Sequence, residues 1–450
     1  MVSRFDIPLR VSSARIRRIA AETSSEYTLI YTRPAGLEWV DHGLERMVQV
    51  AGYTGAALLY ADRFTSVGGK LSPAPVIDWQ KGSLRDDFDF GGVMLFRSDA
   101  LKEAASRMGD EYEYAGLYDL WLKLSQKGSI VHINEYLYSE VELDTRKSGE
   151  KLFDYVDPRN REVQIEMEKA CTEHLKAVGG WLAPEFRSVD FADSAENGRF
   201  DFEASVVIPC RNRVRTVADA VQSALSQQAD FPFNVIVVDD NSTDGTAELL
   251  DGIRDPRLVV IHQPAGYHVI GGNWNAALHD PRCGRFAIQL DSDDVYSGPD
   301  TVRRFVEAFR EQQCPMIIGS YRITDFNLNE LPPGVIDHRE WTAENGRNNA
   351  LRINGLGAPR AFWTPLLRKI NFPVVKYGED YAVALRISRE YQIGRIWDVL
   401  YDCRRWEDNS DAALDVAQVN ANNLYKDRLR SWELEARIAM NRGKAEGRRL

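Results

Sequence analysis

The feature that most constrains this chain is an apolar run that ends abruptly in acidic residues. Phe286–Leu290 is apolar except for one glutamine, and the turn Asp291–Asp294 that follows it carries three carboxylates. This is the pattern of a buried strand that delivers acid groups to one edge of a sheet. Because ligands of open α/β sheets bind at the carboxyl ends of the strands, the sequence predicts a ligand site here.

The spacing of two of these acids predicts a metal ion. Asp291 and Asp293 are two residues apart, so their side chains point the same way in extended chain. Converging carboxylates repel each other unless a cation lies between them, and hard oxygen ligands suit Mg²⁺ or Mn²⁺. The alternative is an acidic turn in which Asp294 or Ser297 caps the following helix.

Composition excludes some classes of partner. The chain has 450 residues, which is too long for one ordinary core, so two or three domains are expected. A net charge of −11 argues against nucleic acid, whose phosphates are bound through a basic surplus. The cysteines are scattered and lack metal-site spacing, which suits a reducing compartment. Without an apolar segment of about 18 residues, we expect a cytoplasmic protein. Peripheral membrane contact and homo-oligomer formation stay open.

Alternating strand-like and helix-like segments predict the α/β class, with a mostly parallel sheet flanked by helices. One such block begins near Glu26 and a second near Phe202. The residues before the first block are expected to form an amphipathic helical lead-in. We therefore predict a first α/β domain (1–140), a helical and loop connector (141–200), a second α/β domain (201–410) and a C-terminal helical segment (411–450).

The two blocks resemble each other in sequence. Tyr27–Tyr31 lines up with Phe286–Leu290 at an offset of 259 residues (286 − 27). Gly116–Leu124 lines up with Glu379–Ile387 at an offset of 263 (379 − 116). Only a small insertion separates these two matches, so we predict that the first block is a truncated copy of the second.

The first block lacks the residues that would carry chemistry. Pro34 stands where the second block has Asp293, and Leu117 stands where it has Asp380. Neither proline nor leucine can bind a metal or take a proton. Too few residues precede Pro34 for a nucleotide-binding half, so we expect this domain to be non-catalytic.

Four stretches of the second block form an ordered set, namely Ser205–Arg213, Val235–Thr246, the acidic turn and Tyr377–Asp380. In this combination the sequence resembles the family 2 glycosyltransferases over roughly Phe202–Asp411. The resemblance implies a GT-A nucleotide-sugar-binding fold, preceded by a truncated GT-A-like domain. It also implies an inverting, metal-dependent hexosyltransferase. Such an enzyme would move a sugar from a nucleotide-diphosphate donor, with a UDP-sugar favoured, to a hydroxyl of a glycan or lipid-linked acceptor in surface polysaccharide or glycoconjugate synthesis.

A nucleoside diphosphate needs a platform for its base, an acceptor for base or ribose donors, and a cation for its phosphates. Arg211 can stack its planar guanidinium on a base. Asp240 can accept from a base N–H or a ribose hydroxyl, with Asp239 as the other candidate. For these two acids, an N-cap and Asx-turn that opens the next helix is the alternative. The predicted donor-binding residues are Pro209, Arg211, Asp239, Asp240, Asn275, Asp291, Ser292 and Arg405.

The resemblance also assigns chemical roles. It implies that Asp293 is the direct metal ligand and that Asp291 orients the ribose or the water shell of the metal. Asp380 is then the general base for the acceptor hydroxyl, with Glu379 beside it as a second catalytic candidate. Alternatively, these last two acids only begin a helix, since acidic side chains favour helix N-termini.

Further segments are open to more than one interpretation. Gly271–Asn275 can bring backbone close to ribose or phosphate, or can simply start a helix. Arg404 or Arg405 can close over the diphosphate, as a basic loop does in the family, or can form a surface pair. Three side chains lie between the acidic turn and the predicted base, where the family builds its acceptor site: Trp341, Asn354 and Trp363.

Two other functional classes remain as alternatives. A sugar nucleotidyltransferase also binds a nucleotide on such a sheet, but it should carry a glycine-rich, basic loop after its first strand. Pro209–Asn212 is not such a loop. A non-catalytic nucleotide-sugar or carbohydrate-binding protein should have lost its acids, whereas Asp293 and Asp380 are present.

Overall fold

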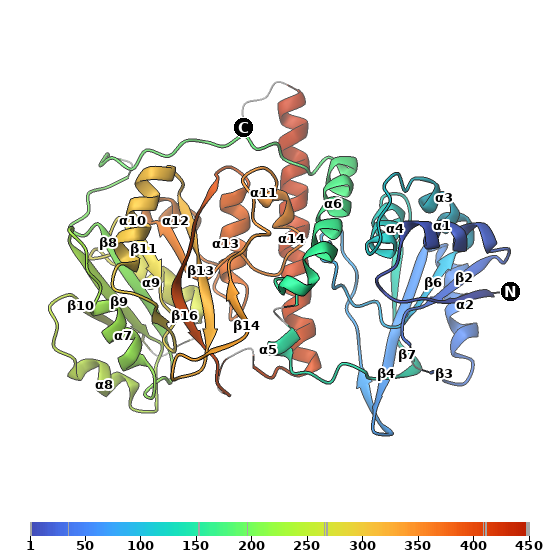
Figure 1. Ribbon diagram of the computed structural model, residues 1–450, viewed down its shortest axis with the longest axis horizontal. Coiled ribbons are helices and arrows are strands. Elements are labelled where there is room, and N and C mark those ends of the chain that lie inside the picture. Colours follow the sequence, from blue (N-terminus) through green and yellow to red (C-terminus); the bar gives the residue numbers. More distant parts are fainter. Residues whose placement is uncertain are drawn as a thin grey trace. The chain divides into compact units, whose positions relative to one another are not determined.

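The structure, a computed structural model, describes residues 2–34, 36–151, 154–195, 197–264, 266, 269–407, 409 and 412–446. It consists of two compact units, and each is built from segments that are distant in the sequence (Figure 1). Unit 1 comprises Met1–Leu182, Leu351–Asn354 and Ala413–Leu450, and unit 2 comprises Ala183–Ala350 and Gly355–Ala412. The domain boundaries expected from the sequence stay predictions.

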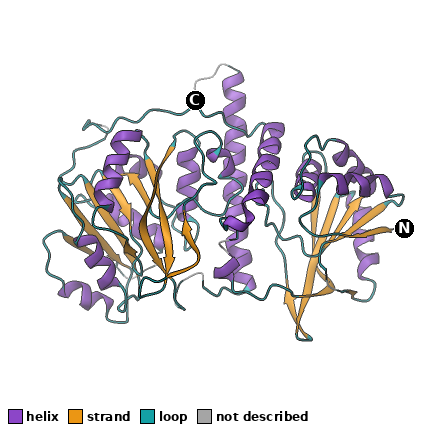
Figure 2. Ribbon diagram, viewed as in Figure 1, coloured by secondary structure: helices purple, strands orange, loops and turns teal. Residues whose placement is uncertain are grey.

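Each unit combines one sheet with helices, which confirms the predicted α/β class (Figure 2). In unit 1 the strands lie in the order β1-β2-β6-β4-β7-β3, and β5 pairs with β4. Their bounds are β1 (Val2–Asp6), β2 (Tyr27–Tyr31), β3 (Leu37–Trp39), β4 (Leu58–Val67), β5 (Lys70–Ala74), β6 (Val93–Arg97) and β7 (Ile130–Val141). Aromatic and β-branched residues fill β2, which is buried along its whole length.

The helices of unit 1 come from both ends of the chain. They are α1 (Ser13–Glu22), α2 (Gly43–Thr54), α3 (Ser98–Ser106), α4 (Gly116–Ser125), α5 (Ser148–Lys151), the short 3₁₀ helix η1 (Pro158–Asn160), α6 (Arg161–Val178) and α14 (Val416–Ala445). Ser12 caps α1 by accepting from the backbone N–H of Arg15, and Asp415 caps α14 by accepting from that of Gln418. Apolar side chains of α2 and of β2, β4, β6 and β7 pack into one core.

In unit 2 the strands lie in the order β10-β9-β8-β11-β15-β13-β16-β12, and β14 pairs with β13. Their bounds are β8 (Ala204–Cys210), β9 (Phe233–Asp239), β10 (Leu258–His262), β11 (Phe286–Gln289), β12 (Val295–Tyr296), β13 (Met316–Thr324), β14 (Glu330–Ile336), β15 (Arg360–Trp363) and β16 (Ile393–Arg404). The helices are α7 (Val217–Leu225), α8 (Thr246–Gly252), α9 (Ile270–His279), α10 (Thr301–Gln312), α11 (Gly346–Asn349), α12 (Thr364–Ile370) and α13 (Glu379–Ser388).

The direction of the strands in unit 2 decides where polar groups gather. Strands β10, β9, β8 and β11 have the predicted parallel direction, whereas β15 is antiparallel to both of its neighbours, so the predicted parallel order holds for this part of the sheet only. Cys210 at the end of β8 pairs in register with Asp239 at the end of β9. The turns after β8, β9 and β11 therefore emerge at one edge of the sheet, which is the ligand-binding edge of α/β folds.

The expected helical lead-in is wrong for the first residues of the chain. Val2–Asp6 forms β1, which pairs in parallel with β2, and the helix begins only at Ser13. The segment is short and carries Arg4 and Asp6, so it shows no apolar run. Its strand conformation depends on hydrogen bonds to β2, whose residues lie 25 positions further along the chain (27 − 2). The local sequence pattern of residues 2–6 does not indicate this pairing. Among the described residues, no helix is both long and apolar enough to cross a membrane.

Candidate active site

The acidic turn after β11 is anchored by its last carboxylate. Asp294 is buried, and it accepts from the hydroxyl of Tyr401 at 2.8 Å and from the backbone N–H of Arg404 at 2.7 Å. Both carboxylate oxygens of Asp294 thus bind β16. The following helix, α10, instead has Asp300 at its N-cap position. The interpretation of this turn as a helix cap is therefore wrong for Asp294.

The carboxylates of this turn are crowded. Asp291 accepts from the side-chain amide of Gln289 at 3.0 Å, and the Tyr401 hydroxyl accepts from the backbone N–H of Asp291. Burial and the nearby charge of Asp293 raise the pKa of Asp291. Burial, together with Asp293 and Asp291, raises the pKa of Asp294. A cation at this turn would relieve the repulsion.

Asp293 lies among groups that the sequence did not single out. Its Oδ2 accepts from the indole N–H of Trp406 at 3.2 Å and from the amide of Asn409 at 3.3 Å. The Nε of Arg213 lies 3.7 Å from the same oxygen. The guanidinium groups of Arg213 and Arg215 both lie over the Trp406 ring. For Arg213 the sequence did contain a signal, because this residue follows Arg211 in the same turn.

The donor set fits a divalent metal that is shared with a phosphate ligand. Within the described residues, no group of three or more His, Cys, Asp or Glu side chains is arranged to hold a metal. Magnesium-type ions are commonly held by one or two carboxylates, with substrate phosphates and water completing the coordination. Asp293 and Asp291 can supply those carboxylates, and their assignment as ligands stays a prediction.

The turns after β8 and β9 bring Arg211 and Asp240 together. Asp240 is buried, and its backbone N–H donates to the carbonyl of Cys210 at 2.8 Å. The Arg211 side chain is 62% exposed, and its Nη1 lies 4.0 Å from Asp240 Oδ2. The exposed guanidinium can stack on a base, and the buried carboxylate beside it can accept a hydrogen bond from the polar edge of that base.

Asp239 has a different surrounding from Asp240. Its Oδ2 lies 3.2 Å from Nδ1 of His262 on β10, so part of this carboxylate fixes the sheet edge. Neither acid caps α8, whose N-cap residue is Gly245. The helix-cap alternative for Asp239 and Asp240 is therefore wrong, and their roles toward a nucleotide stay predictions.

The other predicted donor-binding residues have unequal surroundings. Pro209 lies in β8 opposite Val238, and Ser292 is buried within the acidic turn. Asn275 uses both polar atoms of its side chain on the backbone of Phe372, at 2.8 Å each. That pairing fixes α9 and does not favour a nucleotide contact by the Asn275 side chain.

The two neighbouring arginines at the end of β16 differ in burial. Arg404 is buried, with its Nη1 2.8 Å from Asp219 and its Nε donating to the carbonyl of Asp293 at 2.6 Å. Arg404 therefore holds the acidic turn in place. The backbone N–H of Arg405 donates to Thr324 at 2.8 Å, and its side chain is partly exposed. Of the two, Arg405 remains the candidate for contact with a diphosphate.

The predicted base lies at the N-terminus of α13, opposite a partly buried arginine. Helix α13 begins at Glu379, after Gly378 with a left-handed φ of 78°. Arg360 on β15 places its Nη2 2.7 Å from Asp380 Oδ2. Burial and the charge of Asp380 raise the pKa of Glu379 to about 8.

Arg360 also acts on the acidic turn. The charge of Arg360 opposes the rise in the pKa of Asp291 that burial causes. One guanidinium thus interacts with the predicted base and with a predicted donor-binding carboxylate. Arg360 was not among the residues predicted from the sequence. Its position directly before the apolar run Ala361–Trp363 was a signal that could have found it.

Two of the three side chains expected at an acceptor site are buried and pack against other parts of unit 2. Trp341 is buried and its indole N–H donates to the carbonyl of Ile393 at 3.3 Å. Trp363 is also buried and packs edge-on against Phe191. Asn354 belongs to unit 1. Trp341 and Trp363 are therefore part of the hydrophobic interior of unit 2.

Comparison with known proteins assigns a family to this site. Residues 205–364 match the family model described as Glycosyl transferase family 2. The matched residues include the turns after β8, β9 and β11 and reach the end of β15. The predicted family is thereby confirmed.

Curated relatives carry related descriptions. An uncharacterized glycosyltransferase of Rickettsia felis is 27% identical over 302 residues, which cover 62% of this chain and 48% of that protein. The succinoglycan biosynthesis protein ExoO of Rhizobium meliloti is 37% identical over 107 residues, 23% of this chain and 29% of that protein. The UDP-Glc:alpha-D-GlcNAc-diphosphoundecaprenol beta-1,3-glucosyltransferase WfgD of Escherichia coli is 24% identical over 235 residues, 52% of this chain and 85% of that protein.

The chain spans less than half the length of the first two of these relatives. Apart from Leu351–Asn354, which belong to unit 1, the matched residues lie in unit 2, where they cover the parallel strands and the acidic turn. Residues 205–364 of this chain, which include the candidate site as far as β15, thus match the Glycosyl transferase family 2 model.

Proposed function

We propose that the protein is an inverting, metal-dependent glycosyltransferase that transfers a sugar from a nucleotide-diphosphate donor to an acceptor hydroxyl. The observation that supports this best is the position of Arg360. Its guanidinium pairs with Asp380 at 2.7 Å, and its charge also acts on Asp291. A base for the acceptor and a carboxylate for the donor therefore belong to one site, as a transfer reaction requires.

The donor half of the site is formed by the turns after β8, β9 and β11. Arg211 stacks on the base, and Asp240 accepts from the base or the ribose. Asp293 and Asp291 hold Mn²⁺ or Mg²⁺, which offsets the charge of the diphosphate and of the leaving group. Arg213 and Arg405 add positive charge beside the phosphates.

The acceptor half uses the carboxylate of Asp380. The acceptor oxygen attacks the anomeric carbon while Asp380 accepts its proton, and the bond from that carbon to the phosphate oxygen breaks. Attack from the face opposite the leaving group inverts the configuration. Burial and the charge of Asp380 raise the pKa of Glu379, so a proton shared by these two neighbouring acids is retained to higher pH.

The class of substrate rests on the relatives. The Escherichia coli relative is described with a UDP-glucose donor and a lipid-diphosphate-linked acceptor, and the Rhizobium relative with succinoglycan biosynthesis. We favour a UDP-sugar as donor and a glycan or lipid-linked acceptor, in surface polysaccharide or glycoconjugate synthesis. A cytoplasmic protein with peripheral membrane contact would meet both substrates.

A donor screen followed by product analysis tests this proposal. Thermal stability is measured with a panel of nucleotide sugars, with and without Mn²⁺, and the stabilising donor is then incubated with glycan and lipid-linked acceptors. We expect metal-dependent stabilisation by one donor class and a product whose anomeric configuration, read by NMR, is inverted. Donor binding without transfer to any acceptor would favour a binding protein, and retention of configuration would exclude single displacement.

A further inference from the structure

A short stretch of the second half of the chain is held inside unit 1. Leu351–Asn354 belongs to unit 1, although Ala350 before it and Gly355 after it belong to unit 2. Arg352 is fully buried, and its Nη1 lies 2.7 Å from Asp86 and donates to Gln164 at 2.6 Å. These partners come from the segment before β6 and from α6.

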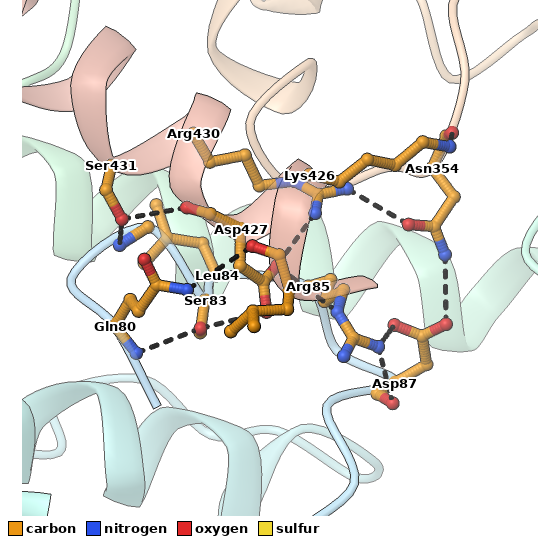
Figure 3. Close-up of polar contacts among 12 residues, drawn as sticks. Gln80, Ser83, Leu84, Arg85, Asp87, Asn354, Lys426, Asp427, Arg430 and Ser431 are labelled. Atoms are coloured by element: carbon orange, nitrogen blue, oxygen red, sulfur yellow. Dashed lines mark hydrogen bonds and ion pairs between the residues drawn. The ribbon is translucent and has the colours of Figure 1, made fainter. Parts of the chain in front are cut away.

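Helix α14 holds the same stretch from another side (Figure 3). Arg430 donates to the carbonyl of Ile353 at 2.9 Å and to Oδ1 of Asn354 at 3.0 Å. Lys426 donates to the carbonyl of Asn354 at 2.6 Å. The amide of Asn354 donates in turn to Asp87 at 2.9 Å. We call the five side chains that grip residues 351–354 the clamp: Asp86, Asp87, Gln164, Lys426 and Arg430.

The clamp is braced by buried charges. Asp427 and Arg430 are both fully buried and pair at 2.8 Å. Asp427 also lies 3.3 Å from Arg85 and accepts from Ser83 at 2.9 Å (Figure 3). Buried charges are costly unless they are paired with good geometry, so this network favours one arrangement of α14 and of the stretch that it grips.

Both flanks of the clamped stretch reach the first turn of α13. On one side, the carbonyl of Ala350 accepts from the hydroxyl of Tyr381, the residue next to the proposed base. On the other side, Arg360 donates to the carbonyls of Leu356 and Gly357 at 3.0 Å each. The same guanidinium pairs with Asp380.

We propose that the clamp in unit 1 is a positioning device for Asp380. Residues 351–354 are covalently continuous with Ala350 and with the segment that Arg360 grips. A shift of the clamped stretch therefore displaces the contacts of Tyr381 and Asp380 together. This inference rests on the proposed function, and it gives unit 1 a role in transfer without any chemistry of its own.

The test exchanges the amide of Asn354 with the carboxylate of Asp87 that it binds. Asn354→Asp places a carboxylate against Asp87, whereas Asn354→Asp combined with Asp87→Asn restores an amide facing a carboxylate. We expect the single variant to lower kcat by about 10-fold to 100-fold, because small misplacements of a catalytic group cost that much. The affinity for the donor should be unchanged, and the double variant should recover most of kcat. Asn354→Ala removes both bonds without adding a charge, and it replaces the aspartate variant should that one not fold.

Hydrogen exchange gives a readout that does not need activity. We expect faster exchange in the peptide 378–388 of the Asn354 variants, no change in the peptide 301–312, and recovery in the double variant. Asn441→Asp is the matched control, since Asn441 binds the carbonyls of Gly179 and Trp181 on the same helix, α14, but not the clamped stretch.

Wild-type kcat and wild-type exchange at 378–388 in the Asn354 variants would overturn the inference. A loss of kcat that the double variant does not restore, or an equal loss in Asn441→Asp, would also overturn it and indicate general destabilisation. A wild-type protein that transfers no sugar would instead contradict the proposed function. The exchange measurement would still decide whether the clamp orders α13.

Discussion

In unit 2 the buried strand β11 leads into a turn of carboxylates, whereas β2 of unit 1 is followed by Thr32, Arg33 and Pro34. The two strands occupy the same place in their sheets. The strand order in unit 1 is β1-β2-β6-β4-β7-β3, and it corresponds strand by strand to β8-β11-β15-β13-β16-β12 in unit 2. The additional pairing of β5 with β4 corresponds to that of β14 with β13. Each pair of neighbouring strands in unit 1 has the same relative direction, parallel or antiparallel, as its counterpart in unit 2. One scaffold is therefore present twice, with different side chains at the same edge.

The sheet of unit 2 continues past β8 with β9 and β10, while β1 is the end of the path in unit 1. Asp239 and Asp240 lie at the end of β9, and His262 lies at the end of β10. Within the described part of unit 1, the groups proposed to receive a nucleotide base thus have no counterpart. That unit 1 is a truncated copy of the second domain stays a prediction.

Ion pairs occupy the equivalent edge of unit 1. Arg63 is buried, and it lies 2.6 Å from Glu140 and 2.9 Å from Asp89. Although burial opposes it, Arg63 and Arg33 lower the pKa of Asp89 to about 2. In unit 2 the crowding of carboxylates favours a cation, whereas in unit 1 arginines supply the positive charge. The comparison teaches that the same strand arrangement accommodates either crowded carboxylates or paired arginines at this edge.

The largest effect is expected at the acidic turn. Asp293→Ala should abolish transfer, because the cation that neutralises the diphosphate loses its direct ligand, and excess chelator should do the same to the wild type. Pro34→Ala at the corresponding place in unit 1 should leave transfer unchanged. Transfer is measured with the donor identified by the screen. Full activity in excess chelator would contradict the metal assignment and leave arginines to carry the phosphate charge.

Asp380→Asn should separate chemistry from binding. The amide cannot accept the proton of the acceptor, so kcat should fall by about 10²–10⁴-fold while the affinity for the donor is retained. Asp119→Asn, near the start of the corresponding helix α4, should leave kcat unchanged. Steady-state kinetics and calorimetry measure the two quantities. Loss of donor affinity with a normal rate in the bound complex would make Asp380 a binding residue.

Arg63→Met should affect stability instead of transfer. The change leaves the buried Glu140 with only the more distant Arg33, 3.5 Å away, as a cation, so the loss should approach the roughly 3–5 kcal/mol of unfolding free energy that breaking a buried pair costs. Denaturant unfolding measures that loss, and transfer by the folded variant should match the wild type. A variant that unfolds like the wild type but has lost donor affinity would place a ligand site in unit 1.

Glu379→Gln should have an effect that depends on pH. The pKa of Glu379 rises from 4.5 to about 8 on folding, so the folded state binds the proton more tightly than the unfolded state. The unfolding free energy of the wild type should therefore fall as the pH rises from about 4.5 to about 8, and the glutamine variant should lack this fall. Thermal unfolding across that pH range measures the difference. Gly116 stands at this place in unit 1, so no such dependence is expected there. Identical pH profiles for wild type and variant would refute the shifted pKa.

Local patterns predicted the elements on which the site is built. The apolar run that precedes Asp291 predicted the bounds of β11 within one residue. The internal repeat placed Pro34 and Leu117 at the positions that correspond to Asp293 and Asp380. A strand and the turn after it are formed by consecutive residues. The pattern of apolar and charged residues along the sequence is therefore enough to predict them.

The rest depends on residues that meet only in the folded chain. The pairing of Arg360 with Asp380 joins positions 20 residues apart (380 − 360), and the contact of Trp406 with Asp293 joins positions 113 apart. Asn354 was expected near an acceptor, and its side chain is bound by Asp87 and Arg430 of the clamp. No periodicity records such contacts, so the sequence could not predict them. The chemical roles of the predicted site residues stay predictions.

Calorimetric titration of the protein with UDP in the presence of Mn²⁺ tests most directly the claim that only unit 2 binds and uses a nucleotide. The account predicts one site per chain, which is lost in Asp293→Ala and retained in Arg33→Ala. Two sites per chain, or a single site that is abolished by a substitution confined to residues 26–140, would contradict it.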